Sequence, residues 1–337
     1  MKTTLVASIL EQKQRLGMLV GAYPGLELTG KTVYQAVHDP LVQLEAQEAL
    51  NERYGSLFFQ TAMDLSIEAE TFGAQVRFEQ DDIPTIEGRL VSDRRELQAL
   101  IDPKPGHKRT TVPLSTVRLL KERARGRLNF VLGGMIGPFS LASRLFGVSE
   151  ALMLTAQDPE LMTALVETAT RFLVRYANAF KLNEADGIFL AEPTAGLISP
   201  KAMARFSMPY VRQIVEAVQS ETFTVIYHNC GAKLVHLPVV LEDKAAIHHF
   251  GKLMDIPAAL DQAGPDVVLA GNLDPAGTFY DSSPAEVYRQ ASELLAQTAA
   301  YPNFLLSSGC DLPPGTPLAN LDAFYQALAD FNKYRAG

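Results

Sequence analysis

One histidine and two cysteines carry the clearest chemical signal in this chain. His228 and Cys230 lie at the end of the segment VIYHNCG, which runs from Val225 to Gly231. An apolar run of this length before a glycine predicts a short buried strand. Because residues i and i+2 of a strand share a face, the imidazole and the thiol can point at one place. A third donor, Cys310, follows another apolar run, NFLLSSGC.

One imidazole and two thiolates form a donor set that suits Zn²⁺. Three protein ligands with a fourth position open are typical of a catalytic zinc, whereas a structural site would need a fourth Cys or His. The chain has only two cysteines. The alternative is that Cys230 and Cys310 are small buried hydrophobic residues and that His228 is a hydrogen-bonded core histidine. The His-x-Cys spacing by itself leaves both interpretations open.

Strands whose ends meet are required to bring these donors together. Seven short apolar runs alternate with helical patterns: SLFFQTAMD (56–64), LNFVLGG (128–134), GIFLAEP (187–193), FTVIYHNC (223–230), AAIHHF (245–250), DVVLAGN (266–272) and NFLLSSGC (303–310). This alternation predicts an α/β fold, a (β/α)8 TIM-type barrel whose eighth strand has no clear pattern. His228, Cys230 and Cys310 then lie at the carboxyl ends of strands, where barrel active sites are built.

The rest of the chain is expected to extend and cover this barrel. Residues 1–54 predict an N-terminal helical extension, with a Gly/Pro break at 21–30 and an amphipathic stretch over 32–54. The charge- and proline-rich region 77–127 is expected to hold a small β-ribbon. We interpret residues 1–337 as a single barrel domain.

Local capping signals predict where the later helices begin. Ser283-Pro284-Ala285-Glu286 is a capping box with proline at the first helical position. Ser199-Pro200 predicts the start of one helix through KAMARFSMPYVRQIVEAVQ, and Asn320 is expected to cap the last helix.

Composition excludes several functional classes. The 337 residues carry 30 basic and 38 acidic side chains, a net charge of −8, without the basic stripe that a nucleic-acid surface needs. No stretch approaches the roughly 18 apolar residues that span a bilayer, and charges interrupt the N-terminus too early for a secretory signal. We therefore expect a cytoplasmic protein whose cysteines remain thiols, without nucleic-acid or membrane partners.

Several longer motifs resemble one known family. HNCGAKL, AGNLDPAGTFYDSSPAEV and NFLLSSGCDLPPGTPLANLDAF resemble the methylcobalamin:coenzyme M methyltransferases, a branch of the uroporphyrinogen decarboxylase superfamily. PGLELTGKTV, MDLSIEAETFGAQVRF and AEPTAGLISPKAMARFSMPYV follow the same pattern, so the resemblance covers most of the chain. It implies a TIM-type barrel and a zinc site made by His228, Cys230 and Cys310.

The resemblance also implies an activity and its partners. Members of this family move a methyl group from a methylated corrinoid to a thiol such as coenzyme M, and zinc lowers the pKa of that thiol. The chain has no Asp-x-His-x-x-Gly motif for binding a corrinoid. The methylcobamide is therefore expected to arrive on a separate corrinoid protein.

Three alternatives remain open at this stage. The acceptor could be tetrahydrofolate with the same donor. The chain could be a uroporphyrinogen decarboxylase, although it lacks the arginine-bearing N-terminal motif of that branch and the decarboxylation needs no metal. It could also be a non-catalytic zinc-stabilised module that delivers or shields a corrinoid.

Two carboxylates at the ends of predicted strands are candidate catalytic groups. Asp64 in QTAMD and Glu192 in FLAEP could orient the substrate or fill the fourth zinc position. The alternative is that they cap the following helix or face solvent. His248 and His249 are neighbours in a strand, so they point to opposite faces and cannot both reach the metal.

Three further polar residues are candidates for contacts with the cofactor. Asn229 lies between the two donors of HNCG, Asn272 lies in GNLDP, and Asp311 follows Cys310 directly. Asn272 can equally stabilise a strand-end turn. Asp311 can hydrogen-bond a metal ligand from behind.

Overall fold

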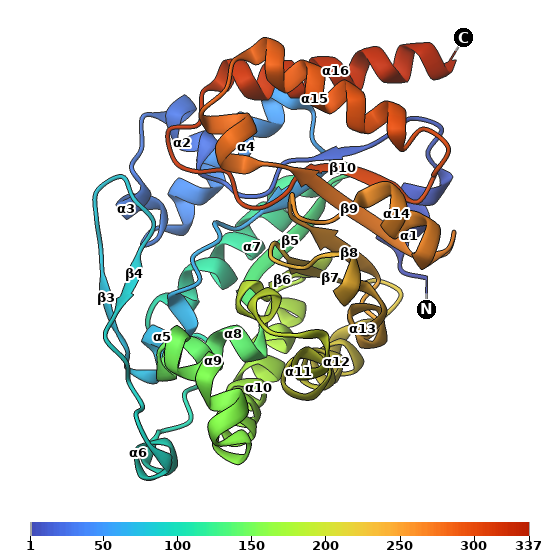
Figure 1. Ribbon diagram of the computed structural model, residues 1–337. Helices are drawn as coiled ribbons and strands as arrows, with labels where there is room; N and C mark the ends of the chain where they lie inside the picture. The colour runs from blue at the N-terminus through green and yellow to red at the C-terminus, as the bar shows by residue number, and fades with distance from the viewer. Residues whose placement is uncertain (1, 337) are drawn as a thin grey trace.

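Across residues 2–336, which the computed structural model describes, eight parallel strands form one sheet that curves into a barrel (Figure 1). The order of the strands is β1-β10-β9-β8-β7-β6-β5-β2. Their bounds are β1 (Gly17–Met18), β2 (Phe58–Gln60), β5 (Phe130–Ile136), β6 (Gly187–Ala191), β7 (Thr224–Asn229), β8 (Ile247–Phe250), β9 (Val268–Leu273) and β10 (Phe304–Ser308). The predicted (β/α)8 barrel is confirmed, and each of the seven apolar runs supplies one strand.

Helices connect the strands and cover the outside of the barrel. The α-helices are α1 (Thr4–Glu11), α2 (Pro24–Thr29), α3 (Val33–Ala36), α4 (Pro40–Tyr54), α5 (Ile67–Phe72), α6 (Arg94–Ala99), α7 (Thr111–Ala124), α8 (Pro138–Phe146), α9 (Val148–Gln157), α10 (Pro159–Leu182), α11 (Pro200–Phe206), α12 (Met208–Val218), α13 (Leu237–Val240), α14 (Ile256–Ala263), α15 (Pro284–Gln297) and α16 (Leu318–Ala336). The 3₁₀ helices are η1 (Lys108–Thr110), η2 (Pro193–Leu197), η3 (Leu234–His236) and η4 (Leu241–Asp243), and η5 (Pro275–Tyr280) is a short π-helix. No helix within residues 2–336 is long and apolar enough to cross a membrane.

The eighth strand is β1, a two-residue segment that the sequence pattern does not reveal. Gly17 pairs with Leu306 and Met18 with Ser307 of β10. This segment lies inside residues 1–54, so the expected helical extension also supplies part of the barrel wall. Two residues are too few for the alternation or the apolar run by which strands are recognised.

Glutamine side chains connect β1 to β2, the two strands at the ends of the sheet order. The Gln60 side-chain amide donates to the Leu19 carbonyl at 2.9 Å. Gln47 of α4 accepts from the Gln60 backbone N–H at 2.9 Å and donates to the Gly21 carbonyl at 3.3 Å. Both glutamines are buried, so these bonds satisfy backbone groups at the point where the sheet closes.

The helix boundaries differ from the expectation in the N-terminal region. The Gly/Pro segment 21–30 contains α2, because Pro24 stands at the start of the helix, where its missing N–H costs nothing. The stretch 32–54 is divided into α3 and α4 at Asp39-Pro40, where the Asp39 carboxylate accepts from the Leu41 N–H at 2.9 Å. Proline cannot continue the preceding helix but starts the next one well.

Two later helix predictions also need correction. The helix predicted to begin at Ser199 ends at Phe206, and α12 begins at Met208 with Pro209 in its first turn. Asn320 does not cap α16 but lies inside its first turn, where its side-chain amide donates to the Phe279 carbonyl at 2.7 Å. The cap at Ser283 is present, since its side chain accepts from the Glu286 N–H at 3.3 Å.

Apolar side chains fill the barrel, and α1 closes its amino-terminal end. Val6 and Ile9 of α1 belong to the same buried cluster as Ile226 of β7 inside the barrel. The Thr4 N–H donates to the Glu221 carbonyl at 2.7 Å and holds the helix there. His228 and Cys230 lie at the opposite end, where the strands terminate.

A two-stranded antiparallel ribbon stands beside the barrel (Figure 1). It consists of β3 (Gln75–Arg77) and β4 (Thr85–Glu87), which confirms the ribbon expected in region 77–127 apart from its first two residues. Phe78 anchors it, because its ring lies 4.8 Å from that of His38, between ring centroids. The connection between β3 and β4 thereby reaches the mouth of the barrel.

Candidate active site

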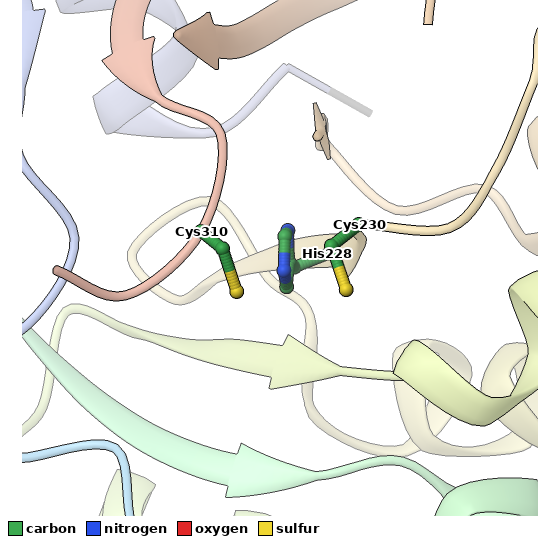
Figure 2. A group of neighbouring side chains, drawn as sticks. All are labelled: His228, Cys230 and Cys310. Carbon is green, nitrogen blue, oxygen red and sulfur yellow. The ribbon is translucent and has the colours of Figure 1, made fainter. Parts of the chain in front are cut away.

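His228, Cys230 and Cys310 converge at the carboxyl-terminal end of the barrel. His228 lies in β7, Cys230 follows that strand directly, and Cys310 lies two residues beyond β10. Their ligand atoms are all within 4.8 Å of one another. Figure 2 shows the imidazole between the two cysteines, with both sulfur atoms directed to the same side. The geometry expected from the strand-end spacing is therefore present.

The chemistry of this cluster fits a zinc ion. His228 Nε2 is buried and has no hydrogen-bond partner within residues 2–336, so its lone pair is free to bind a metal. Both cysteines are free thiols, and Cys310 donates a hydrogen bond to Cys230 that lowers the pKa of the Cys230 thiol. A buried imidazole nitrogen beside a thiolate and a second thiol is a donor set that zinc prefers.

The cluster forms one wall of a pocket of about 380 Å³. Its lining includes apolar side chains from the ends of several strands and from the ribbon, among them Val20, Met63, Phe189, Ile83 and Ile86. Arg144 of α8 also lines it; burial lowers the pKa of this guanidinium, and the nearby charge of Asp64 acts in the opposite direction. The pocket thus combines a wall with a His-Cys-Cys donor set, apolar walls and one arginine.

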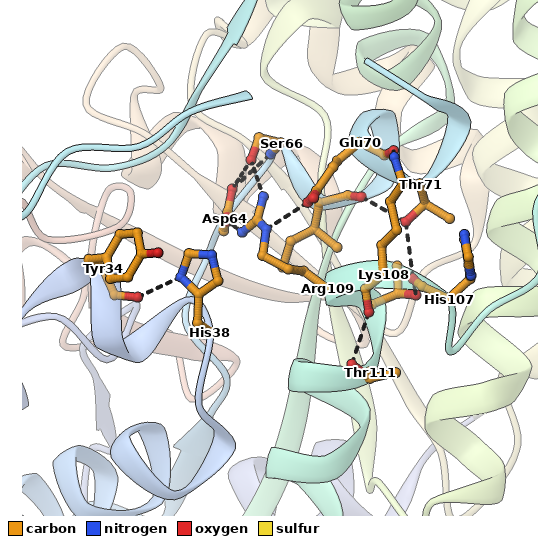
Figure 3. Close-up of polar contacts among 12 residues, drawn as sticks. Tyr34, His38, Asp64, Ser66, Glu70, Thr71, His107, Lys108, Arg109 and Thr111 are labelled. Atoms are coloured by element: carbon orange, nitrogen blue, oxygen red, sulfur yellow. Dashed lines mark hydrogen bonds and ion pairs between the residues drawn. The ribbon is translucent and has the colours of Figure 1, made fainter. Parts of the chain in front are cut away.

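Asp64 lies at this end of the barrel but does not reach the cysteine cluster. Its carboxylate accepts from the Ser66 N–H at 2.9 Å and forms an ion pair with Arg109 (Figure 3). The Arg109 guanidinium also donates to Glu70 at 2.6 Å and stacks on Phe78, 4.6 Å from its ring centroid. Asp64 is 1% exposed, so this network ties the barrel rim to the ribbon.

Glu192 caps a helix rather than facing the pocket. Its carboxylate accepts from the Phe139 and Ser140 N–H groups of α8 at 2.8 and 3.1 Å, and from the Ser207 hydroxyl at 2.8 Å. This helix lies earlier in the chain, with α9 and α10 between it and Glu192, and is not the helix that follows Glu192. Gly137 makes room, because a Cβ there would lie 2.1 Å from the Glu192 carboxylate.

Asn229 and Asn272 are held in the turns that follow their strands. Asn229 is fully buried, donates to the Tyr227 hydroxyl at 3.0 Å and accepts from the Gly231 N–H at 3.0 Å. The Asn272 amide donates to the Met254 carbonyl at 2.7 Å. Both side chains therefore shape the strand-end loops, and contact with a cofactor stays a prediction for them.

Asp311 lines the pocket next to Cys310. Both of its carboxyl oxygens are buried without a hydrogen-bond partner in residues 2–336, and burial raises its pKa well above the usual range. Gly21 lies against it with a φ of +100°, and a Cβ there would lie 1.7 Å from the carboxyl oxygen. Of the three predicted cofactor contacts, Asp311 is the one with free polar atoms at the pocket.

Sequence reasoning missed three ionisable residues of this region: Glu68, Arg109 and Arg144. Glu68 had a weak signal, because it stands among the three carboxylates of DLSIEAE after β2. Its carboxylate accepts from the Ile136 N–H at 3.0 Å. The two arginines lie far from any predicted strand end, so only the folded chain brings them to the barrel mouth.

Folding stability is expected to fall between about pH 4.5 and about pH 7 because of Glu68, whose pKa burial raises from 4.5 to about 7. Below this range the carboxyl is protonated in both states, so its contribution is fully present. Above it, folding must bury a charge that the unfolded chain keeps solvated, at a cost of about 3 kcal/mol. We expect Glu68→Gln to reduce this pH dependence in urea unfolding, with Glu192, whose pKa burial also raises to about 7, still contributing, while exposed Glu167→Gln leaves it unchanged. If the free energy of unfolding changed with pH equally in wild type and Glu68→Gln, the raised pKa of Glu68 would be contradicted.

The fold and the site define an enzyme-like class, a TIM-type barrel whose pocket offers a His-Cys-Cys donor set at the carboxyl ends of its strands. The chain belongs to the uroporphyrinogen decarboxylase (URO-D) family, whose model matches residues 20–331. The resemblance inferred from the motifs is thereby confirmed.

The relatives of this chain include enzymes named as methyltransferases and enzymes named as decarboxylases. The chain is 28% identical over 273 residues to the methylcobamide:CoM methyltransferase MtbA of Methanosarcina acetivorans, covering 80% of this chain and 78% of the relative. It is 26% identical over 216 residues to the uroporphyrinogen decarboxylase of Geobacter metallireducens, covering 61% and 62%. A solved structure of a methyltransferase from Methanosarcina mazei superimposes with a TM-score of 0.86 over 97% of both chains at 22% identity, which shows the shared fold.

Proposed function

We propose that this protein transfers a methyl group from a methylated corrinoid, carried by a separate protein, to a thiol such as coenzyme M. The observation that supports this proposal most strongly is the convergence of His228, Cys230 and Cys310 around one point, with the Nε2 lone pair of His228 unpartnered. A decarboxylase acting on a substrate with many carboxylates needs arginines instead of this donor set. Arg144 is the one arginine among the pocket-lining residues of the described chain.

His228, Cys230 and Cys310 would hold a zinc ion, which would lower the pKa of an acceptor thiol bound to it. As thiolates, Cys230 and Cys310 would balance the double positive charge, so the acceptor sulfur would stay electron-rich. In the transfer, a sulfur–carbon bond forms and the cobalt–carbon bond breaks, and its electron pair stays on cobalt. The proton of the thiol leaves to solvent when the thiol binds.

The pocket walls suit a small acceptor and a donor that approaches from outside. Met63 and Phe189 provide apolar surface that excludes water beside the cysteines. Arg144 offers a positive charge for an acidic end of the acceptor. A pocket of about 380 Å³ is near the lower end of the range for small ligands, and a complete corrinoid is several-fold larger. The corrinoid is therefore presented at the mouth by its own protein.

A thiol is favoured over tetrahydrofolate by its affinity for zinc, and both predicted catalytic carboxylates are engaged elsewhere, which leaves Asp311 as the pocket carboxyl with unpartnered oxygens in residues 2–336. A secondary amine is a poor zinc ligand and needs a nearby carboxylate to manage its proton. Asp64 is paired with Arg109, and Glu192 caps α8 at 0% exposure. We propose that these two residues hold the segments around the mouth of the barrel in place and do not transfer protons.

With methylcobalamin as donor, we expect zinc-dependent methylation of coenzyme M or homocysteine and little turnover with tetrahydrofolate. Thiol binding at neutral pH should release close to one proton per zinc, because the bound thiol loses its proton. X-ray absorption should show sulfur ligation rising from two to about three when the thiol is added. Cobalt absorbance and mass analysis of the thiol measure the transfer.

Two outcomes would contradict this proposal in different ways. Turnover with tetrahydrofolate alone, with zinc–sulfur ligation unchanged by every thiol, would keep the methyltransferase and exclude the thiol mechanism. Full activity after reversible removal of all zinc would exclude the metal centre itself.

A further inference from the structure

Behind the cysteine cluster, a chain of hydrogen bonds runs from His228 through two further strands. His228 Nδ1 lies 2.8 Å from Nδ1 of His249 in β8. His249 Nε2 lies 2.9 Å from the hydroxyl oxygen of Ser307 in β10, and this hydroxyl donates to the Ser308 carbonyl at 3.0 Å. His228, His249 and Ser307 are all buried. These hydrogen bonds therefore lie inside the barrel, on the side of His228 away from the pocket.

The carbonyl at the end of this chain determines where each proton lies. A carbonyl only accepts, so the single hydroxyl proton of Ser307 is used on Ser308. The oxygen of Ser307 must then accept from an N–H at Nε2 of His249. A neutral imidazole carries one N–H, and a second proton would place a charge at a fully buried position beside the apolar ring of Phe189. Nδ1 of His249 is consequently an acceptor.

This direction of donation decides the tautomer of His228. Two ring nitrogens 2.8 Å apart share one proton, which must belong to Nδ1 of His228 because Nδ1 of His249 accepts. Nε2 of His228 is then left with its lone pair, and it is the atom that has no partner within residues 2–336. If donors and acceptors were reversed along this chain of hydrogen bonds, Nε2 of His228 would carry the proton and could not bind a metal.

We infer that His249 and Ser307 are positioning residues that hold His228 in its metal-binding tautomer. This inference rests on the proposed zinc centre. The strand register explains how the two imidazoles come into contact, since His228 of β7 and His249 of β8 are directly paired. His248 faces the other way and contacts the buried Asp243 at 2.9 Å. Only one of the two adjacent histidines can therefore serve the site.

Zinc affinity, measured by competition with a chelator, tests this relay of hydrogen bonds from His228 through His249 to Ser307 without any assay of activity. Ser307→Ala removes the hydroxyl that accepts from His249, and His249→Leu removes the acceptor of His228. We expect each to weaken zinc binding about 10- to 100-fold, the usual effect of losing a partner behind a metal ligand. His249→Asn keeps an acceptor near Nδ1 of His228 and should recover most of the affinity. Absorption spectra of the cobalt(II)-substituted protein should rank the variants in the same order of metal binding.

The matched control is His248→Gln, a change at the neighbouring buried histidine on the opposite face. It should lower thermal stability at least as much as His249→Asn while leaving zinc affinity within about twofold of wild type. If the His249 and Ser307 variants bind zinc as tightly as wild type, the relay inference is wrong and the proposed function stands. If wild type itself binds no zinc, the metal centre and the relay both fail.

Discussion

Cys310→Ala is expected to lose most of the zinc that wild type holds at about one ion per chain, and to lower kcat/KM for methyl transfer at least about 100-fold. Cys310 is one of three donors within 4.8 Å, so its loss leaves two ligands, too few to retain the ion. It lies in the loop beyond β10 and not in the core. Elemental analysis and initial rates with methylcobalamin measure the two effects.

The fold itself should survive this change. Loops at the carboxyl ends of barrel strands carry function, whereas stability resides elsewhere in the barrel. We expect the thermal midpoint of Cys310→Ala to match that of wild type from which zinc has been removed. Cys310→Ser, which keeps the size but offers a harder donor, should retain an intermediate amount of zinc. Full zinc occupancy in Cys310→Ala would show that the three-residue site is wrong.

Arg109→Met is expected to destabilise the protein by about 3–5 kcal/mol, the largest effect on folding that the site region offers. The Asp64 side chain is 1% exposed and its carboxylate is paired with this guanidinium, so the variant leaves a buried carboxylate without its counter-ion. The double variant Asp64→Asn/Arg109→Met removes both charges and should recover more than half of the loss. Urea unfolding measures both values.

An exposed ion pair provides the control for this prediction. Arg212 and Glu216 on α12 form an i,i+4 pair whose side chains are 44% and 56% exposed. Arg212→Met should cost less than about 1 kcal/mol, because solvent screens such pairs. An Arg109→Met variant no less stable than Arg212→Met would show that the Asp64–Arg109 pair contributes little.

The barrel and its three donors were predictable because they depend on local and repeating features. Apolar runs of six to nine residues that alternate with helical patterns predict strands, and parallel strands place their carboxyl ends at one edge. His228, Cys230 and Cys310 follow such runs directly, so their convergence needed no knowledge of side-chain packing. The sequence by itself also determined the opposite facing of His248 and His249, since that follows from the two-residue period of a strand.

Tertiary structure alone decided the contacts between residues far apart in the chain. Gly17–Met18 becomes a strand only because β10 offers a free edge, and two residues are too few for a sequence pattern to predict this pairing. Arg109 reaches Asp64, and Ser307 reaches His249, through long-range packing whose partners no sequence period encodes. The roles of these residues depend on which hydrogen-bonding groups become buried together, because a buried polar group must find its partner wherever the fold places one.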